Sequence, residues 1–165
     1  MFTKIFKKLV FTLLVCGVLS PAVSAQENSP FVVYDDELKN GWVNWSWGKI
    51  SMSHPAGSAK PIKVEGEPWS ALALHHEPFS IEGFSKLTFF INGGLEGGQT
   101  LAIKLIVDGK PLDSNYLIQP KMKSWAVAEV LLSDLGANGS QIDGIWFQTQ
   151  AEKSAPYYVT RIQFE

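Results

Sequence analysis

The feature that most constrains this chain is a series of short segments in which apolar and polar side chains alternate, separated by glycine, asparagine and proline. Alternation with a period of two is typical of a β-strand with one buried face. In the segment 101–107, Lys104 falls on one side, and the large apolar residues fall on the other: Leu101, Ile103, Leu105 and Val107. Asp108-Gly109 follows directly and is typical of a tight hairpin turn.

The same pattern predicts strands at 31–34, 45–47, 49–52, 70–76, 87–91, 101–107, 116–118, 125–130, 145–149 and 157–164. Only residues 131–135 have the apolar spacing of a helical turn, which Gly136 ends. Neither an internal repeat nor an interdomain linker interrupts these segments. The sequence therefore predicts an all-β fold, a single β-sandwich or jelly roll of about eight to ten antiparallel strands.

Residues 1–25 are predicted to be a secretory signal peptide. Three lysines precede an apolar stretch, 9–19, that is too short to span a bilayer comfortably, and small residues then lead to a cleavage site after Ala25. The alternative, a lipoprotein signal using Cys16, lacks the small residue wanted before that cysteine. We therefore expect a mature domain of residues 26–165 that is secreted or periplasmic and has no membrane span.

The composition of the mature chain excludes cysteine chemistry and argues against anionic partners. Cys16 is the single cysteine of the sequence, so residues 26–165 contain neither a disulfide nor a thiolate nucleophile. Three of the 14 basic residues lie in the leader, which leaves 11 against 16 acidic residues and a net charge of −5. A chain of this charge without a basic tract is not expected to bind nucleic acid or an anionic membrane surface.

Period two also predicts a ligand-binding surface. We expect one outer face of the sandwich to carry the residues that alternate with core residues in three strands: Phe90, Asn92, Lys104, Trp146, Gln148 and Gln150. Aromatic planes beside amide groups suit a sugar, because the C–H face of the ring packs on the aromatic plane and its hydroxyls pair with the amides. The alternative is that a loop covers this face or that a bulge shifts the strand phase.

Three of the six tryptophans lie within residues 40–48. Trp45 and Trp47 share a side if this segment is extended, and we expect at least one of them to close the edge of the core. Trp42 follows a turn signal and Trp69 follows a proline, so both are expected on loops, where a ring can contact a ligand. The predicted stacking residues are Trp42, Trp47, Trp69 and Trp146. The predicted hydrogen-bonding residues are Gln148, Gln150, Asn92 and Gln99.

The sequence carries no catalytic signature. His75 and His76 are adjacent and point to opposite sides of a strand, and no HExxH motif or cysteine set accompanies them. No Gly-x-Ser-x-Gly elbow is present, while the acidic residues fall mostly at turns, with a spacing that leaves a glycosidase pair open. We therefore predict no catalytic residue, no catalytic metal and no cofactor. Asp35 and Asp36 are weak candidates for calcium ligands.

The order of several motifs adds a family resemblance. The motifs are VYDD at 33–36, NGW at 40–42, LTFFINGG at 87–94, WAV at 125–127, LLSDLG at 131–136, IWFQ at 145–148 and YYVTRI at 157–162. Together they resemble the non-catalytic carbohydrate-binding modules with a galactose-binding-like jelly roll, across nearly all of the mature chain. The resemblance implies that fold and the binding of a polysaccharide. Thr160 and Arg161 stand where many such modules carry an aspartate, which puts a structural calcium in doubt.

Three functions follow from these observations. The first is a secreted module that binds a polysaccharide or cell-wall glycan through exposed aromatics and amides without cleaving it. The second is an extracellular module that docks another protein, or assembles a matrix, through the same aromatic surface. The third and weakest is a small polysaccharide-active enzyme, which needs two acids facing each other across a cleft.

Overall fold

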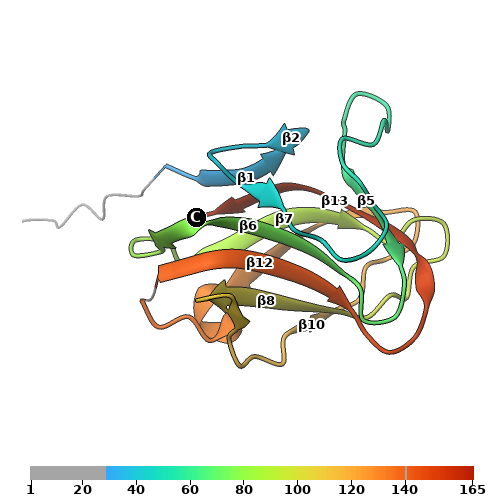
Figure 1. Ribbon diagram of the computed structural model, residues 1–165. Helices are drawn as coiled ribbons and strands as arrows, with labels where there is room; N and C mark the ends of the chain where they lie inside the picture. The colour runs from blue at the N-terminus through green and yellow to red at the C-terminus, as the bar shows by residue number, and fades with distance from the viewer. Residues whose placement is uncertain (1–28, 140) are drawn as a thin grey trace, which may run out of the picture.

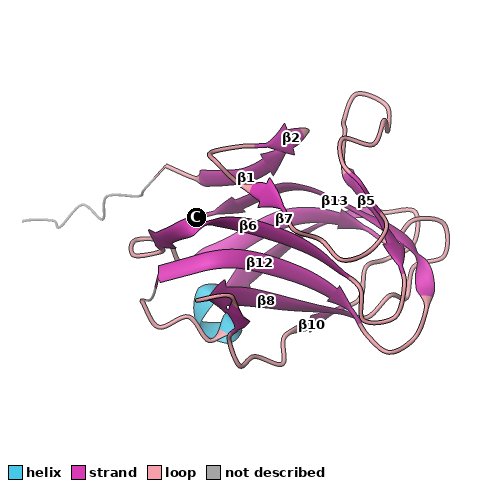
Figure 2. Ribbon diagram, in the orientation of Figure 1, coloured by secondary structure: helices cyan, strands magenta, loops and turns pink. Residues whose placement is uncertain are grey.

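The structure, a computed structural model, describes residues 29–139 and 141–165, so the predicted leader and Cys16 lie outside the described residues. Two antiparallel sheets form the two layers of a sandwich (Figure 1, Figure 2). This arrangement confirms the predicted all-β sandwich of the jelly-roll type. The described part has thirteen strands, more than predicted, because five of them are only two residues long. It contains no helix that is long and apolar enough to cross a membrane.

One layer, sheet A, has the strand order β11-β7-β13-β1-β2, and β5 and β4 extend it beside β13. Its strands are β1 Phe31–Asp35, β2 Glu37–Leu38, β4 Ile50–Ser51, β5 Ile62–Gly66, β7 Lys86–Asn92, β11 Trp125–Leu131 and β13 Ser154–Phe164. The long strand β13 pairs with β5 through its first half and with β1 through its second half. It therefore ties both ends of the sheet together.

The other layer, sheet B, has the strand order β10-β8-β12-β6-β3, with β9 joined to β8. Its strands are β3 Val43–Asn44, β6 Ala71–Ser80, β8 Leu101–Val107, β9 Lys110–Pro111, β10 Leu117–Ile118 and β12 Gln141–Thr149. Figure 1 shows β12 at the centre, between β6 and β8. Asp108 and Gly109 both have positive φ, 50° and 70°, and they form the predicted hairpin turn between β8 and β9.

The core lies between the sheets and is filled by alternate residues of the long strands. Leu101, Ile103 and Leu105 of β8 are fully buried, as the alternation predicts. Phe89 of sheet A meets Phe147 of sheet B edge to face, with ring centroids 4.9 Å apart. The two outer sides of the sandwich are therefore left to the residues that alternate with these, and they are the surfaces on which a ligand can bind.

The observed elements differ from the predicted ones in short segments and at the ends of three long strands: β6 extends to Ser80, β12 begins at Gln141 and β13 begins at Ser154. Residues 45–47 run beside β6 with one isolated bridge, from Trp47 to Ala71, and the strand in this region is β3. Sequence analysis missed β5, although its burial alternates strictly, because a loop rich in proline and glycine precedes it. The predicted helical turn is the 3₁₀ helix η1, Leu132–Leu135, which Gly136 ends in a left-handed conformation.

Candidate functional site

The outer side of sheet B carries aromatic rings on a floor of small residues. We call this surface the B face and define it by five residues: Trp45, Trp47, Trp69, Trp146 and Gln148. Strand pairing sets Trp146 opposite Ala73 of β6, and the isolated bridge sets Trp47 opposite Ala71. Both alanines point outward and are nevertheless buried, as expected for small residues between large neighbouring side chains. Small residues in β6 therefore leave space beside them for the two indoles.

Trp47 is held by contacts on two sides. Its ring meets the ring of Trp146 edge to face, with centroids 4.7 Å apart and planes at 83°. Its indole N–H donates to the carbonyl oxygen of Trp69 at 2.8 Å. The side chain is still 41% exposed. Trp47 is thus a fixed ring with part of its surface open to solvent, as a stacking platform requires.

Trp45 is the most exposed ring of the B face, at 63%. One of its faces stacks on the imidazole of His75, with centroids 3.6 Å apart and planes at 11°. The backbone is fixed as well, because Trp45 N–H donates to the Ala73 carbonyl at 2.9 Å. The sequence analysis expected at least one of Trp45 and Trp47 to close the core edge, and both are exposed instead.

Trp69 lies in the turn before β6 and is 55% exposed. Its φ is 58°, a conformation that is a genuine outlier for a bulky side chain. Two hydrogen bonds hold it there, because its N–H donates to the Gln150 carbonyl at 3.2 Å and its carbonyl accepts from Trp47. Backbone strain of this kind persists where the surroundings enforce it, commonly at ligand sites. The exposed position predicted for Trp69 is therefore confirmed.

The polar part of the B face comes from β12 and β8. Gln148 is half-buried and lies two residues after Trp146, on the same side of β12. Lys104 is the cross-strand neighbour of Trp146, and its ammonium group donates to the Ser114 carbonyl at 3.0 Å. Among the described residues no hydrogen bond engages the Gln148 side chain, so this amide and a tethered cation flank the indoles.

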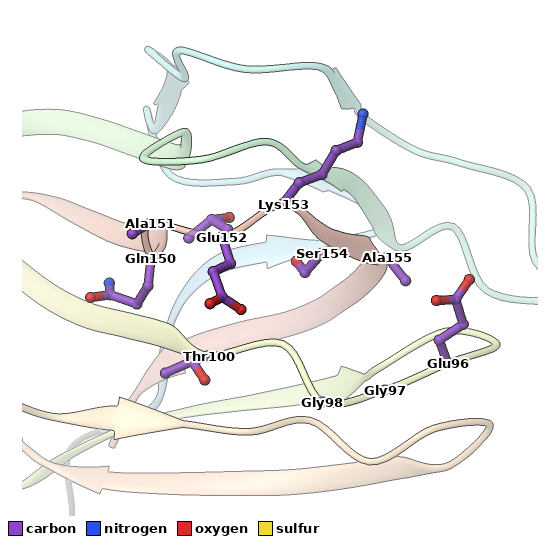
Figure 3. A pocket seen from close by; sticks show the side chains of 11 residues that line it. Glu96, Gly97, Gly98, Thr100, Gln150, Ala151, Glu152, Lys153, Ser154 and Ala155 are labelled. Carbon is purple, nitrogen blue, oxygen red and sulfur yellow. The ribbon is translucent and has the colours of Figure 1, made fainter.

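Gln150 lies past the end of β12, where it lines a hollow of about 500 Å³ between two loops (Figure 3). Within the described residues, the buried hydroxyl oxygens of Thr149 and Ser154 in this lining have no hydrogen-bond partner. Figure 3 shows Glu152 near the middle of the lining residues and Glu96 at one side, beside Gly97. The hollow therefore adds polar groups past the end of β12, and its two acids come from different loops.

Trp42 is not a ligand platform, and its prediction as one is wrong. It is 3% exposed and packs against the Phe164 ring, with centroids 6.3 Å apart and planes at 24°. It also meets the ring of His76 at 5.2 Å. The reason is the alternation within its own segment, because Val43 points outward and Trp42 therefore points inward.

Gln99 is also wrongly predicted as a hydrogen-bonding ligand residue. Its side chain is fully buried. The amide nitrogen donates to the carbonyl oxygens of Gly93 at 2.8 Å and Ala155 at 3.0 Å. Gln99 thus joins the loop after β7 to the start of β13, a structural role that satisfies polar backbone groups.

The predicted single outer face is divided between two surfaces on opposite sides of the sandwich. Phe90 and Asn92 belong to β7 and point outward from sheet A, whereas Lys104, Trp146 and Gln148 point outward from sheet B. The physical reason is that alternation decides which residues of one strand share a side. It does not decide to which of two sheets that strand belongs. Asn92 is therefore separated from the predicted tryptophan site.

The histidines and aspartates considered as metal ligands lie apart or are engaged elsewhere. His75 and His76 point to opposite sides of β6, as predicted, with His75 on Trp45 outside and His76 against Trp42 inside. The Asp36 carboxylate accepts a hydrogen bond from the Lys60 N–H at 2.7 Å. Within residues 29–139 and 141–165, no three His, Cys, Asp or Glu side chains gather as a metal-binding group.

Solved structures of carbohydrate-binding modules have a similar fold. A variant of a family 29 carbohydrate-binding module superposes with a TM-score of 0.64 at 15% identity, covering 84% of this chain and 92% of that module. A variant complexed with cellulohexaose gives 0.63 at 16%, covering 82% and 89%. One complexed with mannohexaose gives 0.62 at 15%, covering 82% and 90%. The chain has the fold of these carbohydrate-binding modules. The fold implied by the sequence resemblance is thus confirmed.

Comparison of sequences relates the chain to part of a longer protein. No family model matches the chain. An endoglucanase from Dictyostelium discoideum is 25% identical over 142 residues, which cover 79% of this chain and 20% of that protein. The chain therefore spans about a fifth of the length of this relative.

Proposed function

We propose that this chain is a secreted, non-catalytic module that binds a polysaccharide on its B face. The observation that carries the proposal is the set of exposed, braced indoles of Trp45, Trp47 and Trp69. Contiguous exposed aromatic surface on a small protein usually marks a binding site. Rings fixed before binding lose little conformational entropy when a ligand stacks on them.

The spacing of the rings suits a linear glycan. Trp45 and Trp47 lie beside Ala73 and Ala71, two residues apart along β6. Two residues of an extended strand span about 7 Å, so the rings meet successive parts of a sugar chain. Gln148 on the neighbouring strand supplies amide donors and acceptors for hydroxyls. The chemistry of the B face is therefore that of a pyranose chain, apolar on its ring faces and polar at its edges.

The relatives favour glucan or mannan as the ligand class. Structures with this fold were solved with cellulohexaose and with mannohexaose. The sequence relative is named an endoglucanase, and the match extends over a fifth of it. A match of that extent is what an accessory binding module of a larger polysaccharide-degrading protein would give. We therefore place unbranched glucans and mannans first among the candidate ligands.

The composition of the B face supports binding without cleavage. On the outer side of sheet B, strand pairing aligns residues of β6, β12 and β8 in three neighbouring rows. The first row includes Trp47 and Ala71, and the third includes Val43 and His75. These rows contain no carboxylate, and a glycosidase requires two carboxyl groups at the scissile bond. Lys104, the ionisable partner of Trp146 in these rows, is tethered to a backbone carbonyl.

Affinity-gel retardation with soluble glycans tests the proposal. The full chain, expressed with its own leader and purified, is run through gels that contain hydroxyethylcellulose, glucomannan, xylan or alginate. We expect a glucan or a mannan to retard it, and Trp47→Ala to abolish most of the retardation. Leu131→Ala is the matched control, because Leu131 is also a large exposed apolar residue, at 52% against 41% for Trp47, and lies on the other sheet. Retardation that is absent in all gels would refute the proposal and favour a protein partner. Retardation that is unchanged in Trp47→Ala would refute the B face as the binding surface.

A further inference from the structure

The outer side of sheet A carries a second set of aromatic and amide groups, far from the B face. We call it the A face and define it by four residues: Phe90, Asn92, Trp125 and Tyr158. Strand pairing aligns Tyr158 of β13, Asn92 of β7 and Trp125 of β11 in one row. Trp125 is 43% exposed, while Tyr158 and Asn92 are half-buried. Because β7 lies between β11 and β13, the rings of Trp125 and Tyr158 stand about 10 Å from each other, with the Asn92 amide between them.

A hollow of about 240 Å³ lies over this row, and its wall is completed by four further residues: Ala56, Gly94, Leu95 and Lys123. Its volume is below the range of pockets that enclose drug-sized ligands, so it suits a single sugar ring rather than a long segment. Lys123 is the one charged residue of the lining. The side chains that line the hollow thus provide two aromatic rings, one amide and one ammonium donor, beside the apolar groups of Ala56 and Leu95.

Asn92 is oriented for a ligand by its own turn. Its carboxamide oxygen accepts the Gly94 N–H at 2.8 Å, which fixes the rotation of the amide group. Within the described residues no hydrogen bond engages the amide nitrogen. That nitrogen therefore keeps two donors for hydroxyl oxygens of a ligand in the hollow.

The walls of the hollow are held by backbone contacts between two loops. Gly93 N–H donates to the Lys121 carbonyl at 2.9 Å, and Lys123 N–H donates to the Gly94 carbonyl at 2.6 Å. A Cβ atom at Gly94 would collide with the Pro156 carbonyl oxygen, so this close approach requires glycine. Lys123 itself has a φ of 51°, which places enforced strain at the A face as Trp69 does at the B face.

We propose that the A face is a second glycan-binding site, so that one chain binds two polysaccharide segments. The inference goes beyond the proposed function, which concerns the B face alone. Its basis is the aromatic, amide, aromatic row with a donor left free at its centre. The two sheets form separate layers (Figure 1), and their outer sides point away from each other. A module with both sites therefore cross-links glycan chains instead of only coating them.

The test compares the full chain with three variants: Trp47→Ala, Trp125→Ala and the double variant. Val127→Ala is the matched control, because it shortens an exposed residue of β11 that points to the same side and lies outside the hollow. Calorimetry with cellohexaose and mannohexaose counts sites per chain. Light scattering of mixtures with glucomannan reports cross-linking, and size-exclusion chromatography confirms that each protein has the same mass.

We expect two hexasaccharides to bind each wild-type chain and one to bind each single variant, and only the wild type and Val127→Ala to cross-link glucomannan. Loss of one site should also weaken binding to the long polymer by roughly tenfold, because bivalent attachment is lost. One site per wild-type chain that Trp125→Ala leaves intact would overturn the inference while the proposed function stands. One site that is lost in Trp125→Ala and kept in Trp47→Ala would overturn the proposed function instead. No binding to the wild type would overturn both.

Discussion

The two outer faces of the sandwich use the same residue types in different arrangements. On the B face the rings touch, with Trp47 against Trp146 and Trp45 against His75. On the A face Asn92 separates Trp125 from Tyr158 in the strand register. Pairs of rings that follow the strands of the B face would support several consecutive sugars, whereas two separated rings on the A face would enclose one. Under the two proposals, the arrangement of the aromatic residues, rather than their number, sets the length of glycan that each face holds.

The two faces also differ in the charged groups that they carry. The central rows of the B face contain one ammonium group, that of Lys104, and it is engaged by Ser114. On the A face the Arg161 guanidinium lies over the Phe90 ring, 5.3 Å from its centroid. Near it, Lys86 forms ion pairs with Glu129 at 3.3 Å and Glu165 at 3.2 Å. A neutral strip bordered by one cation suits a neutral polymer, and the A face offers such a polymer only the hollow beside Trp125.

The largest effect is expected at Trp42, which belongs to the core beneath both faces. Trp42→Ala should lower the free energy of unfolding by about 3–5 kcal/mol, the usual cost of truncating a buried aromatic residue. Trp45→Ala, three positions later, removes an exposed ring and should change stability by less than about 1 kcal/mol. Urea denaturation followed by circular dichroism measures both. Equal losses in the two variants would show that the distinction between core and B-face tryptophans is wrong.

The next largest effect is expected in the glycan affinity of the B face when Trp45 is replaced. Trp45→Ala should weaken binding of a glucan or mannan by roughly tenfold, near 1.4 kcal/mol, because an exposed stacking ring is removed. Trp45→Tyr keeps an aromatic plane above His75 and should retain most of the affinity. Calorimetry in the Trp125→Ala background isolates the B face. If the tyrosine and alanine variants lose the same affinity, stacking at this position is not the source of binding.

The faces also show what the sequence can predict. Alternation predicted the core residues of β8 and the strand β12, because those patterns depend on one strand alone. The face on which Asn92 lies was predicted wrongly, because the sheet to which β7 belongs is set by pairing with β11 and β13. Such pairing depends on residues far apart in the chain, which local periodicity does not report.

The tryptophans illustrate the same limit at a finer scale. The turn before Trp42 predicted an exposed ring, whereas alternation with the outward Val43 places the ring in the core. The Trp-Ser-Trp spacing at 45–47 was a usable signal for two rings on one side, yet which side is wet follows only from pairing with β6. Trp125 and Tyr158 became candidates only when the register placed them beside Asn92.

A smaller effect should distinguish the amides of the two faces. Gln148→Ala removes a hydrogen-bonding group on the B face and should cost about 1 kcal/mol of glycan affinity, as for a neutral hydrogen bond. Asn92→Ala should leave that B-face affinity unchanged and lower binding only at the A face. Calorimetry in the Trp125→Ala and Trp47→Ala backgrounds measures each face alone. A loss of B-face affinity in Asn92→Ala would mean that the two faces are not independent.

The smallest expected effect is a loss of folding stability at acidic pH, caused by Glu165 of sheet A. Desolvation raises the pKa of Glu165, but hydrogen bonds from Gln163 and Lys86 outweigh it, so the folded-state pKa lies below the ordinary value of 4.5. A carboxyl group with a lowered folded pKa adds stability above its unfolded pKa, and this stability is lost as the pH falls through the folded pKa. Stability should therefore decline below about pH 4.5, and Glu165→Gln should flatten part of that decline.

Glu77→Gln is the control for this titration, because Glu77 is exposed and forms no ion pair within the described residues. Urea midpoints measured at several pH values between 6 and 3, roughly one unit apart, should fall together for the wild type and Glu77→Gln and fall less for Glu165→Gln. If Glu165→Gln follows the wild type throughout, the ion pair between Lys86 and Glu165 does not stabilise sheet A. The charged border that distinguishes that face from the neutral B face would then affect ligand choice alone.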